Sequence, residues 1–297
     1  MNAFPGIELT RGVPLSQRTT LRLGGPAVAE ALVRSEEGFS SLDELLRQEG
    51  AAPLALGAGS NILAADGPLP LVLVRPGNGR EPEILGQEHG ATRVLVPAAL
   101  RLPGLLAWAA SWGLAGLDGL TGIPGYIGGA VAMNAGSYGS EMGQVLTRVR
   151  IWRPGQSLSW IEARDCRLDY RTFDPGIPGF FLVWEAELAL RQDQVSAVRE
   201  RMAAAYIRKK ATQPVTAHTC GCVFKNPPGA SAGWLLDQCG FKGRTEGGMG
   251  FSALHANFLV NLGQGTTAQA LTLLDQARRA VAEKFGPILQ CEVRMVP

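Results

Sequence analysis

Residues 119–139 read GLTGIPGYIGGAVAMNAGSYG, and this stretch decides how the rest of the chain is interpreted. Pro124 fixes one backbone angle in a run where side chains are repeatedly missing. Four glycines remove side chains along one face: Gly122, Gly125, Gly128 and Gly129. We interpret the stretch as backbone that lies flat against a large planar ligand and its pyrophosphate. A purely structural loop is the alternative that the residues by themselves leave open.

Bulk composition narrows the class of protein. The chain has 297 residues, of which 46% are hydrophobic and 18% charged, so it is long enough for two or three domains with a sizeable core. A net charge of +2 does not indicate a nucleic-acid binder. No apolar stretch approaches the roughly 20 residues that span a bilayer, and the N-terminus lacks a signal-peptide layout. The five cysteines are an odd number, unlike a secreted disulfide framework. We expect a reduced, cytoplasmic protein that does not bind membranes or nucleic acid.

Hydrophobic periodicity predicts alternating strands and helices, and so an α+β fold. The clearest strand is expected at residues 180–190, where apolar and polar residues alternate. Helical spacing predicts helices at residues 102–112, 192–212 and 267–285.

A composition shift near residue 192 predicts the main domain boundary. Residues 1–191 are expected to form one region and residues 192–297 a second domain. The last expected strand, at residues 288–296, either stays in this second domain or returns to the first region.

A second glycine motif, LGAGSN, follows a predicted strand at residues 56–61. Gly57 and Gly59 allow the backbone to approach an anion, and the N–H groups near Ser60 can point at it. The motif matches neither the dinucleotide-binding fingerprint nor the P-loop. By itself it supports a phosphate cradle and a simple tight turn equally.

The segment TCGCVFKNP at residues 219–227 places Cys220 and Cys222 two residues apart. This spacing is too tight for the usual zinc pair, no second pair exists, and no C-x-x-C redox motif is present. We therefore expect no metal. Inert, buried cysteine is the expectation for Cys166, Cys239 and Cys291.

These motifs, read together, occur in the order of a known family. In this chain they are TTLRLGG, LGAGSNIL, GIPGYIGGAVAMNAGSYG, DYR, GCVFKNP, GFKGRTEGGMGFSALHANFLVN and CEVR. From about residue 19 to residue 296 the chain resembles the UDP-N-acetylenolpyruvoylglucosamine reductase (MurB) family. The resemblance implies a UDP-N-acetylmuramate dehydrogenase of peptidoglycan biosynthesis, an oxidoreductase that uses FAD and NADPH to reduce an enolpyruvyl UDP-sugar. We expect it to act as a monomer.

The resemblance also implies a fold and a cofactor site. The fold is the vanillyl-alcohol-oxidase (PCMH-type) FAD-binding fold of two α+β subdomains, followed by a C-terminal α+β substrate-binding domain. Residues implied to bind the FAD pyrophosphate are Gly57, Ala58, Gly59, Ser60 and Asn61. Those implied to line the rest of the flavin site are Gly122, Ile123, Pro124, Gly125, Gly128, Gly129, Asn134, Ala135, Gly136 and Ser137. Because none of the three histidines lies in these loops, we expect non-covalent FAD.

Three residues match the catalytic positions of the family. Arg171 and Glu292 match a pair near the substrate carboxylate, although spacing alone favours an exposed arginine and a strand-edge carboxylate. Cys222 takes the place of the usual serine that donates a proton to C2 of the substrate. An ordinary thiol has a pKa of about 8.5, so it is still mostly protonated at neutral pH and can serve as the donor. Cys220 is assigned only to packing.

The resemblance extends to substrate contacts. Residues implied to face the UDP-sugar are Tyr170, Tyr206, Lys225 and Asn226. Arg208 and Lys209 either approach the diphosphate or simply carry charge near a helix end. Only 51 positions (222 minus 171) separate Arg171 from Cys222, so the chain resembles the shorter, type II form. The alternatives are another flavin oxidase or dehydrogenase of the same fold and a non-catalytic flavin-binding module.

Overall fold

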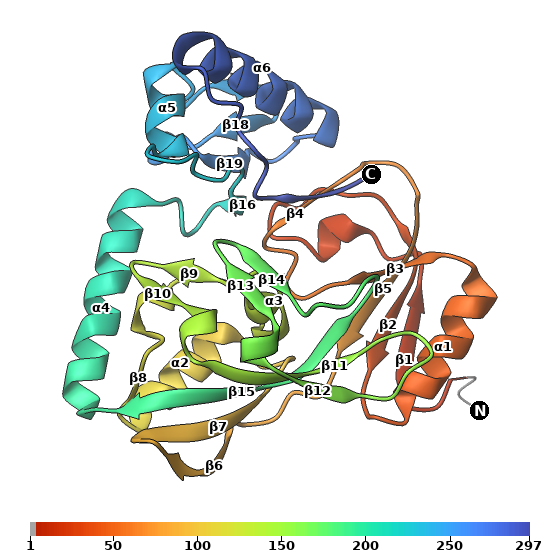
Figure 1. Cartoon of the computed structure of the whole chain (residues 1–297). Helices are drawn as coiled ribbons and strands as arrows, with labels where there is room; N and C mark the ends of the chain where they lie inside the picture. Colours follow the sequence, from red (N-terminus) through yellow and green to blue (C-terminus); the bar gives the residue numbers. More distant parts are fainter. Residues whose placement is uncertain (1–3) are drawn as a thin grey trace. The chain divides into compact units, whose positions relative to one another are not determined.

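The computed structural model describes residues 4–297, which fall into two compact units. The first unit contains the described residues up to Arg11, together with Val28–Ala58 and Pro70–Arg208. The second contains Gly12–Ala27, Gly59–Leu69 and Lys209–Pro297. Each unit has its own hydrophobic core. Figure 1 follows the chain through both units.

The first sheet of the first unit has four strands in the order β1-β2-β5-β3 (Figure 1). They are β1 (Ile7–Arg11), β2 (Ala27–Val33), β5 (Leu69–Pro76) and β3 (Ala52–Ala55). Helix α1 (Gly38–Glu49) packs its buried Phe39, Leu42 and Leu45 against this sheet. Gly50, with φ of 58°, ends the helix in the left-handed conformation that glycine adopts without strain.

The second sheet of the first unit has six strands, and its central strand β15 (Leu182–Gln192) confirms the strand predicted at residues 180–190. The other strands are β12 (Ser159–Glu162), β11 (Leu146–Trp152), β7 (Ala91–Pro97), β6 (Glu83–Glu88) and β8 (Leu114–Ala115). Helices α2 (Leu102–Ser111) and α3 (Ile127–Ala132) bury Leu105 and Val131 in the core beside this sheet. Two short hairpins complete the unit, β9–β10 (Gly136–Ser137 and Ser140–Glu141) and β13–β14 (Arg167–Asp169 and Thr172–Asp174).

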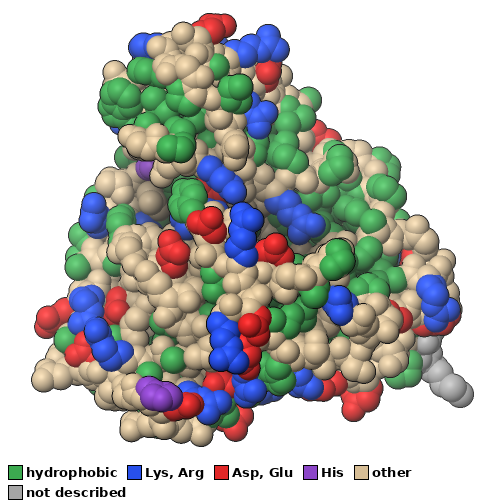
Figure 2. Space-filling view, viewed as in Figure 1, with side chains coloured by type: hydrophobic (Ala, Val, Ile, Leu, Met, Phe, Trp, Pro, Cys, Tyr) green, Lys and Arg blue, Asp and Glu red, His purple; other side chains and the backbone are tan. Residues whose placement is uncertain are grey.

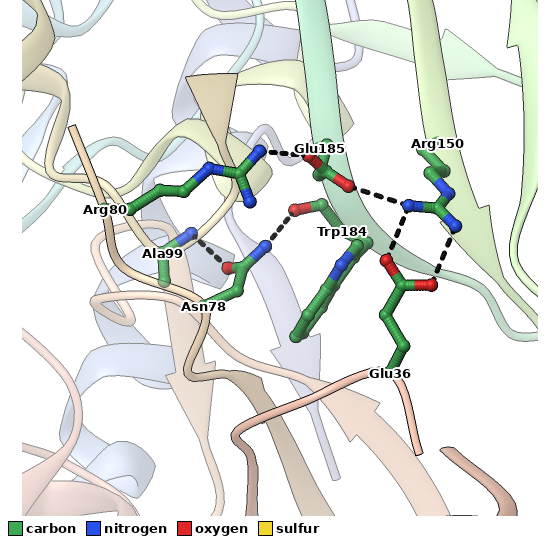
Figure 3. A network of polar contacts seen from close by, with 7 residues as sticks. All are labelled: Glu36, Asn78, Arg80, Ala99, Arg150, Trp184 and Glu185. Carbon is green, nitrogen blue, oxygen red and sulfur yellow. Dashed lines mark hydrogen bonds and ion pairs between the residues drawn. The ribbon is translucent and has the colours of Figure 1, made fainter. Parts of the chain in front are cut away.

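A polar network joins β15 to the loop before α1 within the first unit (Figure 3). The carboxylate of Glu185 accepts hydrogen bonds from Arg80 at 2.7 Å and from Arg150 at 3.0 Å. The Arg150 guanidinium also donates to both oxygens of Glu36, at 2.7 and 2.8 Å. Because an unpaired buried carboxylate is costly, these pairings hold the two sheets of the unit in a fixed arrangement.

The second unit is built on a four-stranded sheet in the order β16-β19-β18-β17. Its strands are β16 (His218–Cys222), β19 (Phe258–Asn261), β18 (Met249–Phe251) and β17 (Thr245–Glu246). Helices α5 (Ala232–Gln238) and α6 (Thr267–Phe285) share one core with this sheet. Helix α6 confirms the helix predicted at residues 267–285, and Thr266 and Gln269 form its capping box. Two strands distant in sequence, β4 (Ile62–Ala64) and β20 (Arg294–Val296), pair in parallel.

Two expectations from the sequence are corrected by the structure. Helix α4 (Val195–Thr212) begins three residues later than predicted, because strand β15 continues to Gln192, which pairs with Leu114 of β8. The apolar residues whose helical spacing predicted this helix are only partly buried, since Val198 is buried but Tyr206 is 45% exposed. The strand expected at residues 288–296 is reduced to β20, so Glu292 lies before the strand, not within it.

The described surface carries both signs of charge. Lys and Arg side chains are interspersed with Asp and Glu on the face seen in Figure 2. Within residues 4–297, none of the helices is both long and apolar enough to cross a membrane.

Glu187 provides a test of how β15 is stabilised. It is 1% exposed and accepts hydrogen bonds from the Nε atoms of Arg93 at 2.6 Å and Arg148 at 2.8 Å. Burial raises the pKa of Glu187, but the bonds from the two arginines outweigh burial and hold the pKa below its usual value. Glu187→Gln should therefore cost about 1–3 kcal/mol of unfolding free energy at pH 7.

The sign of the pH dependence follows from the lowered pKa. The ionised Glu187 stabilises the fold above its unfolded pKa of about 4.3, and this contribution is lost as pH falls through the lower folded pKa. In thermal unfolding between pH 7 and 3, the difference in unfolding free energy between the native protein and Glu187→Gln should shrink as the pH falls. Glu8→Gln is the matched control, because the side chain of Glu8 is 60% exposed in its pair with Arg34 and should contribute less than about 1 kcal/mol. A difference in unfolding free energy between the native protein and Glu187→Gln that stays constant with pH would contradict this role of Glu187.

Candidate active site

The glycine-rich stretch of the first unit forms a turn followed by α3, and its backbone is accessible. Gly122 and Gly125 have φ of 84° and 130°, which side chains rarely tolerate. A Cβ added at Gly129 would meet no atom within 4 Å, whereas one at Gly128 would lie 3.0 Å from the Cβ of Ala98. Gly57 lies beside the same stretch, with the ring of Tyr126 3.6 Å from the position of its missing Cβ. The first unit thus brings residues 57–58 next to residues 122–129, and its open backbone at Gly129 fits a flat ligand.

Asn134 lies just after α3 and is 2% exposed. Its Nδ2 donates to the carbonyl oxygen of Asp169 at 3.0 Å and to the Glu141 carboxylate at 3.1 Å, and its Oδ1 accepts from Gly143 N at 2.8 Å. The side chain is therefore used inside the fold. Within this segment, the residues left to contact a cofactor are the neighbours of Asn134, including Ala135 and Ser137.

Arg171 occupies the tight turn of the β13–β14 hairpin. Tyr170 and Arg171 form its two-residue loop, since Asp169 pairs with Thr172, and Arg171 has φ of 53°. The Nη2 of Arg171 donates to the carbonyl oxygen of Gly136 at 2.7 Å, and its guanidinium carbon lies 4.9 Å from the centre of the Tyr170 ring. The first unit thus brings together the predicted residues 134–137 and 170–171.

Helix α4 carries Tyr206 and Arg208, the second of which contacts the glycine-rich stretch. The Arg208 guanidinium lies 4.6 Å from the centre of the Tyr138 ring, a cation–π geometry. Tyr206 is 45% exposed, and Lys209, the first residue of the second unit in this helix, is 2% exposed.

Three predicted segments meet inside the second unit. Asn61 Nδ2 donates to the carbonyl oxygen of Glu292 at 3.1 Å, and Glu292 N donates to the carbonyl oxygen of Val223 at 2.8 Å. Gly59 is fixed in place as glycine, because its φ is 61° and a Cβ would lie 2.4 Å from the carbonyl oxygen of Arg18. The end of the GAGSN loop, the strand that carries Cys222 and the segment that carries Glu292 are thus direct neighbours.

Cys220 and Cys222 have different surroundings although they are two residues apart. In a regular strand they would point to the same face. The pairing of β16 with β19 is irregular between Thr219 and Cys222, and Gly221 has φ of 78°. Cys220 is consequently buried, with 1% exposed, whereas Cys222 is half-buried. Burial raises the pKa of Cys220 to about 12, which keeps this thiol protonated and suits a packing role.

The residues after Cys222 are held by main-chain and amide contacts. Lys225 N donates to the carbonyl oxygen of Gln290 at 2.8 Å, and Asn226 Oδ1 accepts from Ala232 N at 2.9 Å. Asn257, which the sequence reasoning missed, is 2% exposed and bonds to both the N–H and the carbonyl of Phe224, at 3.0 and 2.8 Å. The signal available in the sequence was an asparagine between Ala256 and Phe258 in an otherwise apolar segment.

A cavity of about 560 Å³ lies in the second unit beside these segments. Its wall includes Thr19, Thr20 and Arg22 of the TTLRLGG motif, to which the sequence reasoning gave no separate role, and also His218. Thr20 Oγ1 donates to the carbonyl oxygen of Thr219 at 2.6 Å, so the motif is attached directly to β16.

Two family models match separate parts of the chain. Residues 27–158 match an FAD binding domain, and residues 213–296 match the C-terminal domain of UDP-N-acetylenolpyruvoylglucosamine reductase. These matches confirm the predicted fold class, an FAD-binding region followed by a C-terminal domain of this family.

Known relatives match over nearly the full length. The UDP-N-acetylenolpyruvoylglucosamine reductase of Oleidesulfovibrio alaskensis is 50% identical over 290 residues, covering 96% of this chain and 97% of the relative. That of Nitratidesulfovibrio vulgaris is 48% identical over 98% of this chain and 99% of its own. The crystal structure of the reductase from Thermus caldophilus is 34% identical, with a TM-score of 0.81 over 98% of this chain and 99% of that one. With such identities along almost its entire length, the chain belongs to the UDP-N-acetylenolpyruvoylglucosamine reductase (MurB) family.

Proposed function

We propose that Cys222, Arg171 and Glu292 are the residues with which this chain reduces its substrate. As a family member, the chain is a UDP-N-acetylmuramate dehydrogenase, an FAD-dependent enzyme of peptidoglycan synthesis. It uses NADPH to reduce the enolpyruvyl group of UDP-N-acetylenolpyruvoylglucosamine to UDP-N-acetylmuramate. The observation that carries the assignment of Cys222 and Glu292 is the contact of Asn61, Val223 and Glu292 within one unit, because it joins a cofactor loop to the segments of both residues.

Residues 57–61, 122–129 and 135–137 are proposed to hold FAD without a covalent bond, whereas Asn134, whose side chain bonds inside the fold, is assigned to supporting its segment and not to contacting the cofactor. The open backbone at Gly129 and the obligatory glycine at Gly59 support this assignment. FAD held by these residues would supply hydride transfer, from NADPH to C3 of the enolpyruvyl group.

The proposed residues supply charge stabilisation and a proton. Negative charge builds up on the enolate as C3 is reduced, and the permanently charged guanidinium of Arg171 stabilises it. Cys222 Sγ then gives its proton to C2, which completes the lactyl group. Glu292 acts as a protonated or hydrogen-bonding partner of the substrate carboxylate. The half-buried position of Cys222, in contrast to Cys220, supports its role as donor.

Four further residues are proposed to bind the UDP-sugar: Tyr170, Tyr206, Lys225 and Asn226. The oxygen of Asn226 already accepts from Ala232 N, so its NH₂ group is the part assigned to the substrate. Arg208 stacks on Tyr138, which suggests that it supports the glycine-rich stretch in addition to any contact with the diphosphate.

The organisation proposed from the sequence assigns residues 1–191 to FAD, in subdomains 1–68 and 69–191, and residues 192–297 to the UDP-sugar. We also propose that the enzyme works as a monomer in the cytoplasm. All five cysteines are free thiols, as expected in a reducing compartment. Light scattering coupled to size-exclusion chromatography measures the oligomeric state.

Anaerobic mixing tests the proposed function directly. The purified protein is expected to be yellow, NADPH should bleach its flavin bands, and UDP-N-acetylenolpyruvoylglucosamine should restore them. A non-catalytic flavin-binding module would not be bleached by NADPH. Another flavin oxidase or dehydrogenase of this fold would be bleached by its own reductant but would not be reoxidised by this UDP-sugar.

Cys222→Ala should separate the two half-reactions. Flavin reduction by NADPH should stay within about 2-fold of the native rate, whereas reoxidation by the enolpyruvyl substrate should slow by about 10²–10⁴-fold through loss of the general acid. Cys222→Ser is the matched variant and should keep substantial activity, because a hydroxyl can replace the thiol as donor. Normal reoxidation in Cys222→Ala would remove this residue from the catalytic assignment.

Gly221→Ala should disturb the position of Cys222 through backbone strain alone. A Cβ at Gly221 meets no atom within 4 Å, but φ is 78°, and a left-handed alanine costs about 1–2 kcal/mol. Reoxidation by the enolpyruvyl substrate should slow by about 10–100-fold as the irregular strand relaxes.

Gly240→Ala is the control for this prediction, because Gly240 has φ of 75° and equally open surroundings in the same unit. Both variants should lose similar stability in thermal unfolding, but only Gly221→Ala should lose activity. Equal reoxidation rates for Gly221→Ala and Gly240→Ala in stopped-flow experiments would show that the irregular backbone at Gly221 is not needed to position Cys222.

A further inference from the structure

We propose that Asn134 is a positioning residue for Arg171, holding the hairpin from which the arginine reaches the substrate. The inference rests on the proposed role of Arg171 in stabilising the enolate. Asn134 lies 35 residues before Asp169 in the chain, yet its side chain bonds directly to the base of the Arg171 hairpin. This positioning role differs from the cofactor-binding role that the sequence predicted for Asn134, because the side-chain amide of Asn134 is directed into the fold.

The amide of Asn134 can satisfy its neighbours in only one orientation. Its Nδ2 faces two acceptors, the carbonyl oxygen of Asp169 and the carboxylate of Glu141, and its Oδ1 faces the N–H of Gly143. Turning the amide over would set two donors against each other at Gly143 and oxygens against oxygens at Asp169 and Glu141. At 2% exposure water cannot replace these bonds easily, so the amide fixes three segments at once.

The backbone conformation of Asn134 also suits asparagine. Its φ is 40°, in the left-handed region where asparagine is more readily accepted than most residues. This turn leads the chain from α3 to Gly136, whose carbonyl oxygen accepts the hydrogen bond from Arg171 Nη2 at 2.7 Å.

Two contacts that hold Arg171 and its hairpin lie at or near Asn134. The first is the carbonyl oxygen of Asp169, where the hairpin strands close around Tyr170 and Arg171. The second is the carbonyl oxygen of Gly136, two residues after Asn134, which fixes the guanidinium itself. Because Arg171 also has a left-handed φ of 53°, its own backbone does not favour this conformation, and the surrounding bonds have to maintain it.

Asn134→Asp is the most direct variant. Aspartate keeps the size of the side chain and tolerates the left-handed backbone, but it sets a carboxylate against Glu141 and against the carbonyl of Asp169. We expect substrate-dependent reoxidation of the reduced enzyme to slow by about 10–100-fold, as misplaced catalytic groups do. The flavin-to-protein ratio and the rate of reduction by NADPH should stay within about 2-fold, since Arg171 acts on the substrate.

A second readout does not depend on turnover. In hydrogen exchange without substrate, the backbone of residues 167–174 should lose protection in Asn134→Asp. Gln144→Ala is the matched control, because the side-chain hydrogen bonds of Gln144 go to Glu141 N and Gly139 O, neither of which belongs to the Arg171 hairpin. It should leave both the exchange of this hairpin and the reoxidation rate unchanged.

A double-mutant cycle tests whether Asn134 acts through Arg171. In the Arg171→Ala background, Asn134→Asp should change the reoxidation rate by less than about 2-fold, because the group it positions is gone. The inference would be overturned if the effects of Asn134→Asp and Arg171→Ala on reoxidation were fully additive. It would also be overturned if Asn134→Asp slowed both half-reactions equally, or if Asn134→Asp and Asn134→Ala both lost bound flavin. An Arg171→Ala variant with native reoxidation would instead refute the role of Arg171, and the inference with it.

Discussion

The two buried carboxylates of β15 impose the constraint on which the first unit depends. Glu185 and Glu187 are 3% and 1% exposed, so leaving either carboxylate without a hydrogen-bonded partner would be costly. The arginines come from β7, β11 and the loop at Arg80, and Arg150 extends the pairing to Glu36 before α1 (Figure 3). Fixed charge pairs thus align the strands on which α3 packs. The glycine-rich stretch around α3 gains a rigid support that its own short helix could not provide.

In both units, a side chain proposed to take part in catalysis lies on irregular backbone that is held by a buried amide. Arg171 turns a hairpin in the left-handed conformation, and Asn134 bonds to the base of that hairpin. Cys222 follows an irregular strand pairing at Gly221, and Asn257 bonds to both main-chain groups of Phe224 just beyond it. Asparagine suits this task because its amide donates and accepts in fixed directions, as a strand partner would. The buried amides of Asn134 and Asn257 thus provide the main-chain hydrogen bonds that regular strand pairing would otherwise provide. They do so where the backbone leaves the regular strand geometry and orients a side chain.

Much of the fold could be predicted because it depends on local signals. The helix at residues 267–285 combines helical spacing with the Thr266–Gln269 capping box, and β15 shows clear alternation. The parallel pairing of β4 with β20, and with it the bond from Asn61 to Glu292, joins residues 231 apart and has no local signature. Strand alternation could not separate Cys220 from Cys222 either, since it puts both on one face, and only the family resemblance assigned them different roles. Gly221 lies between the two cysteines and breaks the alternation, but its positive φ accompanies the irregular pairing with β19, which has no local signature in the sequence.

The separation of the two thiols has a chemical consequence. Burial raises the pKa of Cys220 to about 12, and a thiol that stays protonated and excluded from solvent resists oxidation. Cys222 is half-buried, so the same strand presents one inert thiol and one accessible thiol. A thiol is a stronger acid than a hydroxyl, which favours it as a proton donor, but an accessible thiol can be oxidised to sulfenic acid and beyond, whereas serine cannot. Oxidation would remove the proton that Cys222 delivers in the proposed mechanism. An enzyme with cysteine at this position therefore combines a more acidic donor with a sensitivity to oxidants that the serine form of the family avoids.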